Sequence, residues 1–423
     1  MAILSRHLTP EEYAVYRQTF LCFQVLTPFL AMGFNQGVLY FIPREPEKAA
    51  KIVTEMCLGV ALISLLVALL LWTAGADYVA VWMNNPALVN ALKWAAIFPA
   101  VALPAGLMSP ILIAAGKSRL VPGLSAFQAL LILLCIGGAL YFFGNEALVL
   151  VQARVVAAVV VFVVFAILII AIIPIRKIEC SFDSYKTLVS YSYPLALASG
   201  VAILNKNIDK VLVSIFESPA EAAVFINGAM EIPLISVVTG SVAGILAAEF
   251  SKKYSEGKYE DILRVWKRGT EKVSLILIPG AALLWFFSEE CMVLLYGEQY
   301  KGSAEPFRVY LLLIPLRVMQ GGLFLRVSGH TKVILWFSIG ICASNAVLTT
   351  TLVHLYGMIG AAWGTVITIG VIGFPVGLYL TQRFTGLPAW KYVPLKFICM
   401  ILFCSICIAK IAHYIFTLIS PTN

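Results

Sequence analysis

Residues 205–210 read NKNIDK and form a strongly polar group within an otherwise apolar stretch. In a helix, Lys206 and Lys210 share one face, and Asp209 lies three residues from Lys206, close enough to pair with it. One cation then remains unbalanced. Because a charge inside a membrane-spanning helix is costly, such a group indicates a functional site, and the expected chemistry is the binding of an anion. The alternative is a self-neutralising cluster that only makes the helix polar.

Four more cations, Arg17, Lys93, Arg154 and Arg317, lie inside other apolar stretches. With a helical rise of ~1.5 Å per residue, they lie from about 6 Å to roughly 18 Å inside the ends of their predicted helices, Arg317 being the deepest. The shallower ones permit a second interpretation, because a long side chain near a helix end can extend to the membrane surface. The predicted ligand-binding residues are Lys206, Lys210, Arg317, Arg154, Lys93, Arg17, Asn205 and Asn207.

Two carboxylates could couple an ion to this binding. Glu231 lies about 15 Å into its predicted helix, and Asp209 belongs to the polar group. A buried carboxyl group can have a raised pKa and exchange protons near neutrality, so both residues are predicted ion-coupling sites for H⁺ or Na⁺. The alternative for Glu231 is a structural partner of one of the cations. Glu55 follows Lys51 by four residues, and we expect these two to form a surface pair.

Composition places the chain in a membrane. It has 423 residues, of which 61% are hydrophobic and only 12% are charged, whereas a soluble protein has about 25% charged residues. No signal peptide is recognisable at the start. The nine cysteines lie mostly in apolar runs, which include the C-x-x-C of Cys404 and Cys407, and there are only four histidines. We predict no metal, no cofactor and no enzymatic activity, because no nucleotide-binding or metalloprotease motif is present.

The elements that position these residues are long apolar helices. Interruption by Gly and Pro, without strand-like alternation, favours helices over a transmembrane barrel. We predict an all-α polytopic membrane protein with about twelve spans. They cover approximately residues 13–41, 51–74, 88–114, 121–143, 147–174, 188–215, 221–249, 270–288, 305–328, 331–354, 359–382 and 393–417.

Basic residues in the connections predict the orientation. One set of alternating connections contains nineteen Lys and Arg residues and the other contains three, so the first set is predicted to be cytoplasmic and the C-terminus to lie outside. The net charge of +8 then reflects topology and contact with anionic lipids. Nucleic acid is not an expected partner, because the basic residues are spread over six loops. Within the 251–272 loop, Tyr259, Ile262, Leu263 and Trp266 share one helical face and predict an amphipathic helix on the membrane surface.

The sequence repeats itself at about half its length. LTPEEYAVY (8–16) matches ESPAEAAVF (217–225), and AAGKSRLV (114–121) matches VSGHTKVI (327–334). A Pro in the first turn after Thr or Ser predicts a capped helix start in both copies of the first phrase. The second copy follows an entire helix that the first copy lacks, so the first helix of the N-lobe is expected to be missing, through a late start assignment or a shortened variant. The predicted domains are an N-lobe (1–174), a linker (175–187), a C-lobe (188–385) and an additional helix (386–423).

Four phrases resemble the bacterial polysaccharide flippases, which translocate O-antigen and capsule repeat units. They are LSRHLTPEEYAVYRQ (4–18), YSYPLALASGVAILNKNIDKVLVSIF (191–216), LLYGEQYKGSAEPFRVYLLLIPL (294–316) and ASNAVLTTTLVHLYGMIGAAWGTVIT (343–368). The resemblance implies 12 to 14 helices in two lobes and membership of a superfamily that includes multidrug antiporters and the peptidoglycan lipid flippase.

The resemblance also implies a cargo, a polyprenyl-pyrophosphate-linked oligosaccharide, carried across the bacterial inner membrane for polysaccharide or lipopolysaccharide synthesis. Arginine and lysine would replace the water around the phosphates, and the asparagines with Tyr191 and Tyr193 would face the sugars. Glycosyltransferases or a polymerase are expected partners. The alternatives are another cargo on the same fold, either a peptidoglycan precursor or cationic drugs, and an inactive truncated scaffold. A drug antiporter would be expected to have a negatively charged cavity.

Overall fold

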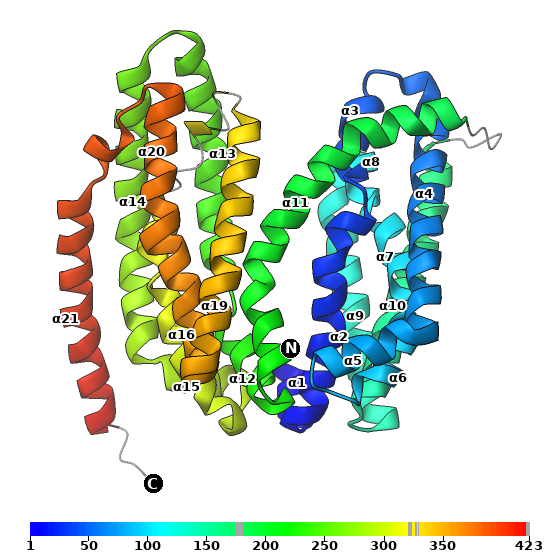
Figure 1. Ribbon diagram of the computed structural model, residues 1–423, viewed down its shortest axis with the longest axis horizontal. Helices are drawn as coiled ribbons and strands as arrows, with labels where there is room; N and C mark the ends of the chain where they lie inside the picture. Colours follow the sequence, from blue (N-terminus) through cyan, green and yellow to red (C-terminus); the bar gives the residue numbers. More distant parts are fainter. Residues whose placement is uncertain (174–180, 320–323, 326–327, 329, 420–423) are drawn as a thin grey trace. The chain divides into compact units, whose positions relative to one another are not determined.

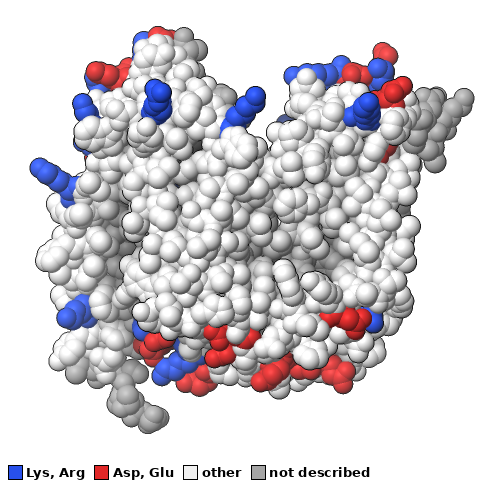
Figure 2. All heavy atoms as spheres, in the orientation of Figure 1, with Lys and Arg blue, Asp and Glu red and all other residues white. Residues whose placement is uncertain are grey.

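The computed structural model describes residues 1–173, 181–319, 324–325, 328 and 330–419. These residues form helices, short 3-10 or π turns and loops, and none of them lies in a strand. The predicted all-α class is therefore confirmed. Charged side chains gather at the two ends of the helices in the view of Figure 2, and the belt between them is almost entirely uncharged. Such a belt suits the hydrocarbon core of a bilayer.

Contacts divide the chain into two compact units, each a bundle of helices (Figure 1). The N-terminal unit comprises His7–Asn207 and Ser218–Ala220, and the C-terminal unit comprises Met1–Arg6, Ile208–Glu217 and Glu221–Asn423. The division at Asn207 falls inside one long helix, α11 (Phe182–Phe216). The predicted lobes follow the sequence repeat rather than these contacts, and their boundaries remain a prediction.

The N-terminal unit contains the helices from α2 to α10 and the first part of α11. Its other helices are α2 (Pro10–Leu30), α3 (Phe34–Phe41), α4 (Ala49–Leu70), α5 (Ala76–Trp82), α6 (Leu88–Ala95), α7 (Phe98–Gly106), α8 (Met108–Ala114), α9 (Val121–Phe143) and α10 (Ala147–Ile172). Short turns lie at Pro46–Lys48, Leu71–Gly75 and Ser118–Leu120.

The C-terminal unit contains the short first helix of the chain and the helices that follow α11. They are α1 (Ala2–His7), α12 (Pro219–Gly228), α13 (Pro233–Ser255), α14 (Tyr259–Phe286), α15 (Ser288–Tyr296), α16 (Ala304–Leu311), α17 (Ile314–Met319), α19 (Thr331–Ile367), α20 (Phe374–Thr385) and α21 (Leu395–Ile419). Short turns lie at Glu298–Ser303, Thr368–Gly373 and Ala389–Tyr392. The α1 helix is held within this unit, because the Arg6 guanidinium donates a hydrogen bond to the carbonyl oxygen of Leu294.

Seven helical stretches in the described residues are long and apolar enough to cross a membrane, or eight if the bent pair Leu88–Ala95 and Phe98–Ala114 forms one span. The predicted number of twelve is not confirmed. Part of the difference is that Lys332–Thr385 forms one continuous stretch where we predicted two spans. This stretch bends at Gly357, whose φ of 62° lies in the left-handed region that residues with a side chain rarely adopt.

The start of α2 has the predicted cap. The Thr9 hydroxyl accepts a hydrogen bond from the backbone N–H of Glu12 at 3.3 Å, and Pro10 occupies the first turn. The Glu12 carboxylate in turn accepts a hydrogen bond from the N–H of Ala147, the first residue of α10, at 2.5 Å. Thr9 therefore caps the N-terminus of α2, and Glu12 caps the N-terminus of α10. The second of these roles could not be predicted from the sequence.

The prediction of an amphipathic surface helix in 251–272 is wrong. The α14 helix begins at Tyr259 and continues into the bundle, and Ile262, Leu263 and Trp266 are at most 1% exposed. The indole N–H of Trp266 donates a hydrogen bond to the carbonyl oxygen of Met319 at 2.5 Å. An apolar helical face looks the same in the sequence whether it covers lipid headgroups or other helices, and here the protein core covers it.

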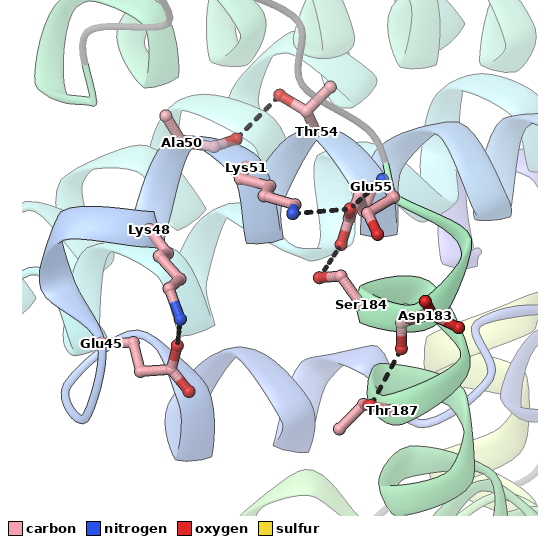
Figure 3. A network of polar contacts seen from close by, with 10 residues as sticks. Glu45, Lys48, Ala50, Lys51, Thr54, Glu55, Asp183, Ser184 and Thr187 are labelled. Atoms are coloured by element: carbon pink, nitrogen blue, oxygen red, sulfur yellow. Dashed lines mark hydrogen bonds and ion pairs between the residues drawn. The ribbon is translucent and has the colours of Figure 1, made fainter.

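The predicted Glu55–Lys51 pair forms, but Glu55 is not at the surface. The carboxylate is only 1% exposed, and Lys51 Nζ lies 3.9 Å from it. Glu55 also accepts hydrogen bonds from the backbone N–H of Ser181 at 2.9 Å and from the Ser184 hydroxyl at 2.6 Å (Figure 3). Glu55 therefore satisfies donors at the start of α11 and ties that helix to α4.

Candidate functional site

A buried polar cluster surrounds Asp209 in the C-terminal unit. The Asp209 side chain is 1% exposed, and one carboxylate oxygen accepts a hydrogen bond from the Thr365 hydroxyl at 3.1 Å. The other accepts one from the backbone N–H of Lys210 at 2.7 Å, and Lys210 Nζ lies 3.9 Å away. The side-chain oxygen of Asn345 accepts hydrogen bonds from Thr349 at 2.8 Å and from Thr365 at 3.4 Å. We refer to Asp209, Asn345, Thr349 and Thr365 as the Asp209 cluster.

The two arms of α19 approach closely enough to form the Asp209 cluster. A Cβ placed on Gly364 would lie 2.6 Å from the Thr349 hydroxyl and 2.8 Å from its Cα, so only glycine fits between them. Asn345 and Thr349 lie one helical turn apart before the bend at Gly357, and Thr365 follows the bend. The result is a group of carboxylate, amide and hydroxyl oxygens, which are the donor types that hard cations prefer. In the described part of the chain, no group of three or more His, Cys, Asp or Glu could hold a metal ion.

Arg317 and Glu231 form an ion pair in the C-terminal unit. Arg317 Nη1 lies 3.1 Å from Glu231 Oε1, and the two side chains are 34% and 29% exposed. Glu231 lies in the short break between α12 and α13, and Arg317 lies near the end of the six-residue helix α17. The pair agrees with the alternative interpretation of Glu231 as a partner of a cation. Its partial exposure leaves the guanidinium accessible on one side.

Arg154 lines a small pocket inside the N-terminal unit. The pocket has a volume of about 40 Å³, and Gln128 and Phe98 lie in the same lining. The guanidinium also lies over the ring of Phe20, with Cζ 5.8 Å from the ring centroid. Arg17 has a comparable position over Tyr13, at 5.7 Å. Both of these arginines therefore combine charge with an aromatic neighbour.

The remaining predicted residues differ in their surroundings. Lys93 Nζ lies 3.5 Å from a carboxylate oxygen of Asp77, which is 57% exposed, so Lys93 belongs to a surface pair. This position favours the second interpretation for Lys93, that of a side chain extending to the membrane surface. Lys206 is exposed and Asn205 half-buried, whereas Asn207 is buried and donates a hydrogen bond to the carbonyl oxygen of Ile203 at 2.9 Å.

The predicted residues divide between the two units. Asp209, Lys210, Glu231 and Arg317 belong to the C-terminal unit, and the others belong to the N-terminal unit. The sequence did not indicate that Asn345, Thr349 and Thr365 surround Asp209. A signal was present, because Asn345 and Thr349 are separated by one helical turn within an apolar stretch, but only the packing of α19 against α11 shows which polar groups meet.

Comparison with known structures defines the fold class. The structure of the lipid II flippase MurJ in an inward closed conformation matches with a TM-score of 0.76 at 15% identity, over 100% of this chain and 91% of that chain. An inward-facing multidrug resistance MATE family transporter of the MOP superfamily matches with a TM-score of 0.77 at 16% identity, over 91% and 94%. A MOP superfamily transporter from Pyrococcus furiosus, described as having a binding pocket of reverse polarity, gives 0.63 at 14% identity, over 91% of each chain. The protein therefore has the fold of the MurJ and MATE structures.

Sequence comparison defines the family. The family model described as polysaccharide biosynthesis protein matches residues 3–305, and the chain belongs to this family. A probable lipid II flippase MurJ of Rhizobium tropici is 26% identical over 111 residues. That match covers 26% of this chain and 21% of the relative, about a fifth of its length. The predicted resemblance is confirmed at the level of the family, and the likeness to the MurJ and MATE structures is one of fold.

Proposed function

We propose that the protein translocates polyprenyl-pyrophosphate-linked oligosaccharide repeat units across the bacterial cytoplasmic membrane. The product would enter surface polysaccharide such as O-antigen, and the C-terminus would lie outside. The observation that favours this cargo is the excess of cations over carboxylates within the membrane-spanning stretches of a polysaccharide biosynthesis protein. Arginine binds phosphate oxygens in bidentate fashion, and a diphosphate crosses hydrocarbon only when its charge is matched.

The proposed transport path uses residues of both units. Arg17, Arg154 and Lys206 of one unit, and Lys210 and Arg317 of the other, are the cations proposed to bind the cargo during alternating access. Asn205 would meet the glycan. Among the predicted residues, Lys93 and Asn207 contribute least to this proposal, because one belongs to a surface pair and the other is buried.

The Asp209 cluster is the proposed coupling site. Its oxygens could bind a proton or Na⁺. Binding of either cation would neutralise the Asp209 carboxylate and so weaken its attraction for the Lys210 ammonium group. Glu231 is the second candidate, since its release from Arg317 on protonation would free the guanidinium for phosphate. Cation binding and cargo binding would then be linked through groups that already contact one another.

The test is complementation of a bacterial strain that lacks its own flippase of this type. Lys206→Gln and Arg317→Gln should abolish surface glycan and cause lipid-linked units to accumulate inside the cell. Lys117→Gln is a matched control, because Lys117 is exposed in a predicted cytoplasmic loop. If all three variants complement like the wild type, the proposed function is wrong and a scaffold role is favoured.

A second candidate is transport of a different lipid-linked cargo on the same fold. The similarity to lipid II flippases favours it, since lipid II is named as the cargo of those relatives. It would be recognised by rescue of a strain depleted of its lipid II flippase without any effect on surface glycan.

A further inference from the structure

A column of stacked side chains lies at one end of the N-terminal unit. The ring of Tyr40 stacks on that of Tyr191, with centroids 4.2 Å apart and an interplanar angle of 27°. The Arg44 guanidinium covers Tyr40, with Cζ 3.8 Å from its centroid. Phe41 meets Tyr191 edge-on, at 5.3 Å and 76°. These residues come from the end of α3, the loop after it and the first part of α11, and the sequence places them on the predicted cytoplasmic side.

Local contacts hold Arg44 in place without neutralising it. Its Nη1 donates a hydrogen bond to the carbonyl oxygen of Tyr40 at 2.9 Å, which fixes the guanidinium over that ring. The adjacent carboxylate of Glu45 is paired with Lys48 at 2.7 Å (Figure 3). Among the described residues, no carboxylate forms an ion pair with Arg44, which is exposed. Most of its five N–H donors therefore remain available to a ligand.

The tyrosines add two more polar groups. Neither the Tyr40 nor the Tyr191 hydroxyl has a hydrogen-bond partner within the part of the chain that the structure describes, and both residues are half-buried. A phenol can donate to phosphate or accept from a sugar hydroxyl, and the ring body excludes water from one side of the site. An isolated Tyr or Arg at this depth would be ordinary for the membrane surface. An ordered column of rings that ends in a guanidinium without an ion-pair partner among the described residues indicates a binding site more strongly than a single Tyr or Arg does.

We propose that Arg44, Tyr40 and Tyr191 form a cytoplasmic entry site for the diphosphate and first sugar of the cargo. This proposal rests on the proposed function and names a site that precedes the membrane-embedded cations. Arg44 binds phosphate oxygens, and the tyrosine hydroxyls bind phosphate or the sugar attached to it.

The test measures binding of a defined probe to the full chain in phosphatidylcholine nanodiscs. The probe is farnesyl pyrophosphate that bears one N-acetylglucosamine. Arg44→Ala should weaken binding about tenfold or more, the size expected for loss of hydrogen bonds to a charged group. Arg44→Lys should bind the probe with an affinity between those of the wild type and Arg44→Ala, because lysine keeps the charge but not the fork of donors. Tyr191→Phe should weaken binding about threefold, since it keeps the stacking and removes one hydroxyl.

Arg119→Ala is the matched control. Arg119 is also an exposed arginine of the same unit in a predicted cytoplasmic loop, and within the described residues it has no ion pair or ring contact. It should change binding less than twofold. Melting temperatures of the variants, which differ at exposed or half-buried positions, check that each is folded. Equal binding by Arg44→Ala and Arg119→Ala overturns the entry site and leaves the proposed function standing.

Two further outcomes distinguish the source of the phosphate. If nanodiscs with 30% phosphatidylglycerol abolish probe binding to the wild type, the column binds phospholipid headgroups and the entry site is overturned. If the wild type binds the probe in neither lipid, the entry site and the proposed cargo class both fail. Binding that persists in phosphatidylglycerol and depends on Arg44 supports the proposal.

Discussion

The Arg317–Glu231 ion pair permits a test that separates structural from functional charge. The perturbation is a double-mutant cycle of Arg317→Gln, Glu231→Gln and both together. Two unit charges about 4 Å apart interact by about 4 kcal/mol at the effective dielectric constant near a protein surface. Because the side chains are 34% and 29% exposed, solvent screening reduces this value, and we expect a coupling energy of about 0.5–1.5 kcal/mol.

The assay combines stability with transport. Unfolding in detergent gives the coupling energy, and surface glycan in the complemented strain gives function. Each single variant should lower stability, and the double variant should recover part of the loss, because neither charge is then left without its partner. If Arg317 binds the cargo, the double variant stays inactive despite its recovered stability.

Two results would refute this reasoning. Independent sites have additive effects on stability, so their coupling energy is zero. A measured coupling energy within about 0.3 kcal/mol of zero would show that the ion pair contributes nothing measurable to stability. Normal surface glycan in the double variant would show that Arg317 serves only to balance Glu231. The second result would remove Arg317 from the proposed binding site.

Three further predictions concern carboxylates. Asp209→Asn should reduce transport at least tenfold and abolish its dependence on an imposed H⁺ or Na⁺ gradient; a retained gradient dependence would exclude Asp209 as the coupling site. Burial raises the pKa of Glu217, and the neighbouring Glu221 carboxyl raises it further. Because the folded-state pKa is raised, Glu217 favours the native state below its unfolded pKa of about 4.3, and this stabilisation is lost as the pH rises through the folded-state pKa. Glu217→Gln should therefore raise the melting temperature at pH 7 and have little effect at pH 4. The reverse pattern would contradict the assignment. Glu55→Gln should destabilise the protein by about 1–3 kcal/mol, because the Ser184 hydroxyl and the backbone N–H of Ser181 lose a charged acceptor. Proteolysis near the start of α11 should increase, and unchanged cleavage would show that Glu55 does not hold that helix.

The sequence by itself determined the class of this protein. Helical membrane segments follow from composition, because a bilayer requires long apolar stretches whose backbone groups are bonded internally. The cap at Thr9 and the pairing of Lys51 with Glu55 were also predictable, since both depend on residues within one helical turn. The same locality explains why the polar character of NKNIDK could be recognised without a structure.

Only the tertiary structure decided what each charged group contacts. Asp209 meets Thr365, which is 156 residues away, and Glu55 meets Ser184, which is 129 residues away. Hydropathy and helical periodicity are properties of neighbouring residues, and they do not reveal which faces of distant helices pack together. Trp266 shows the same limit, because its apolar face could cover lipid or protein, and the packing of helices in its unit places it in the core.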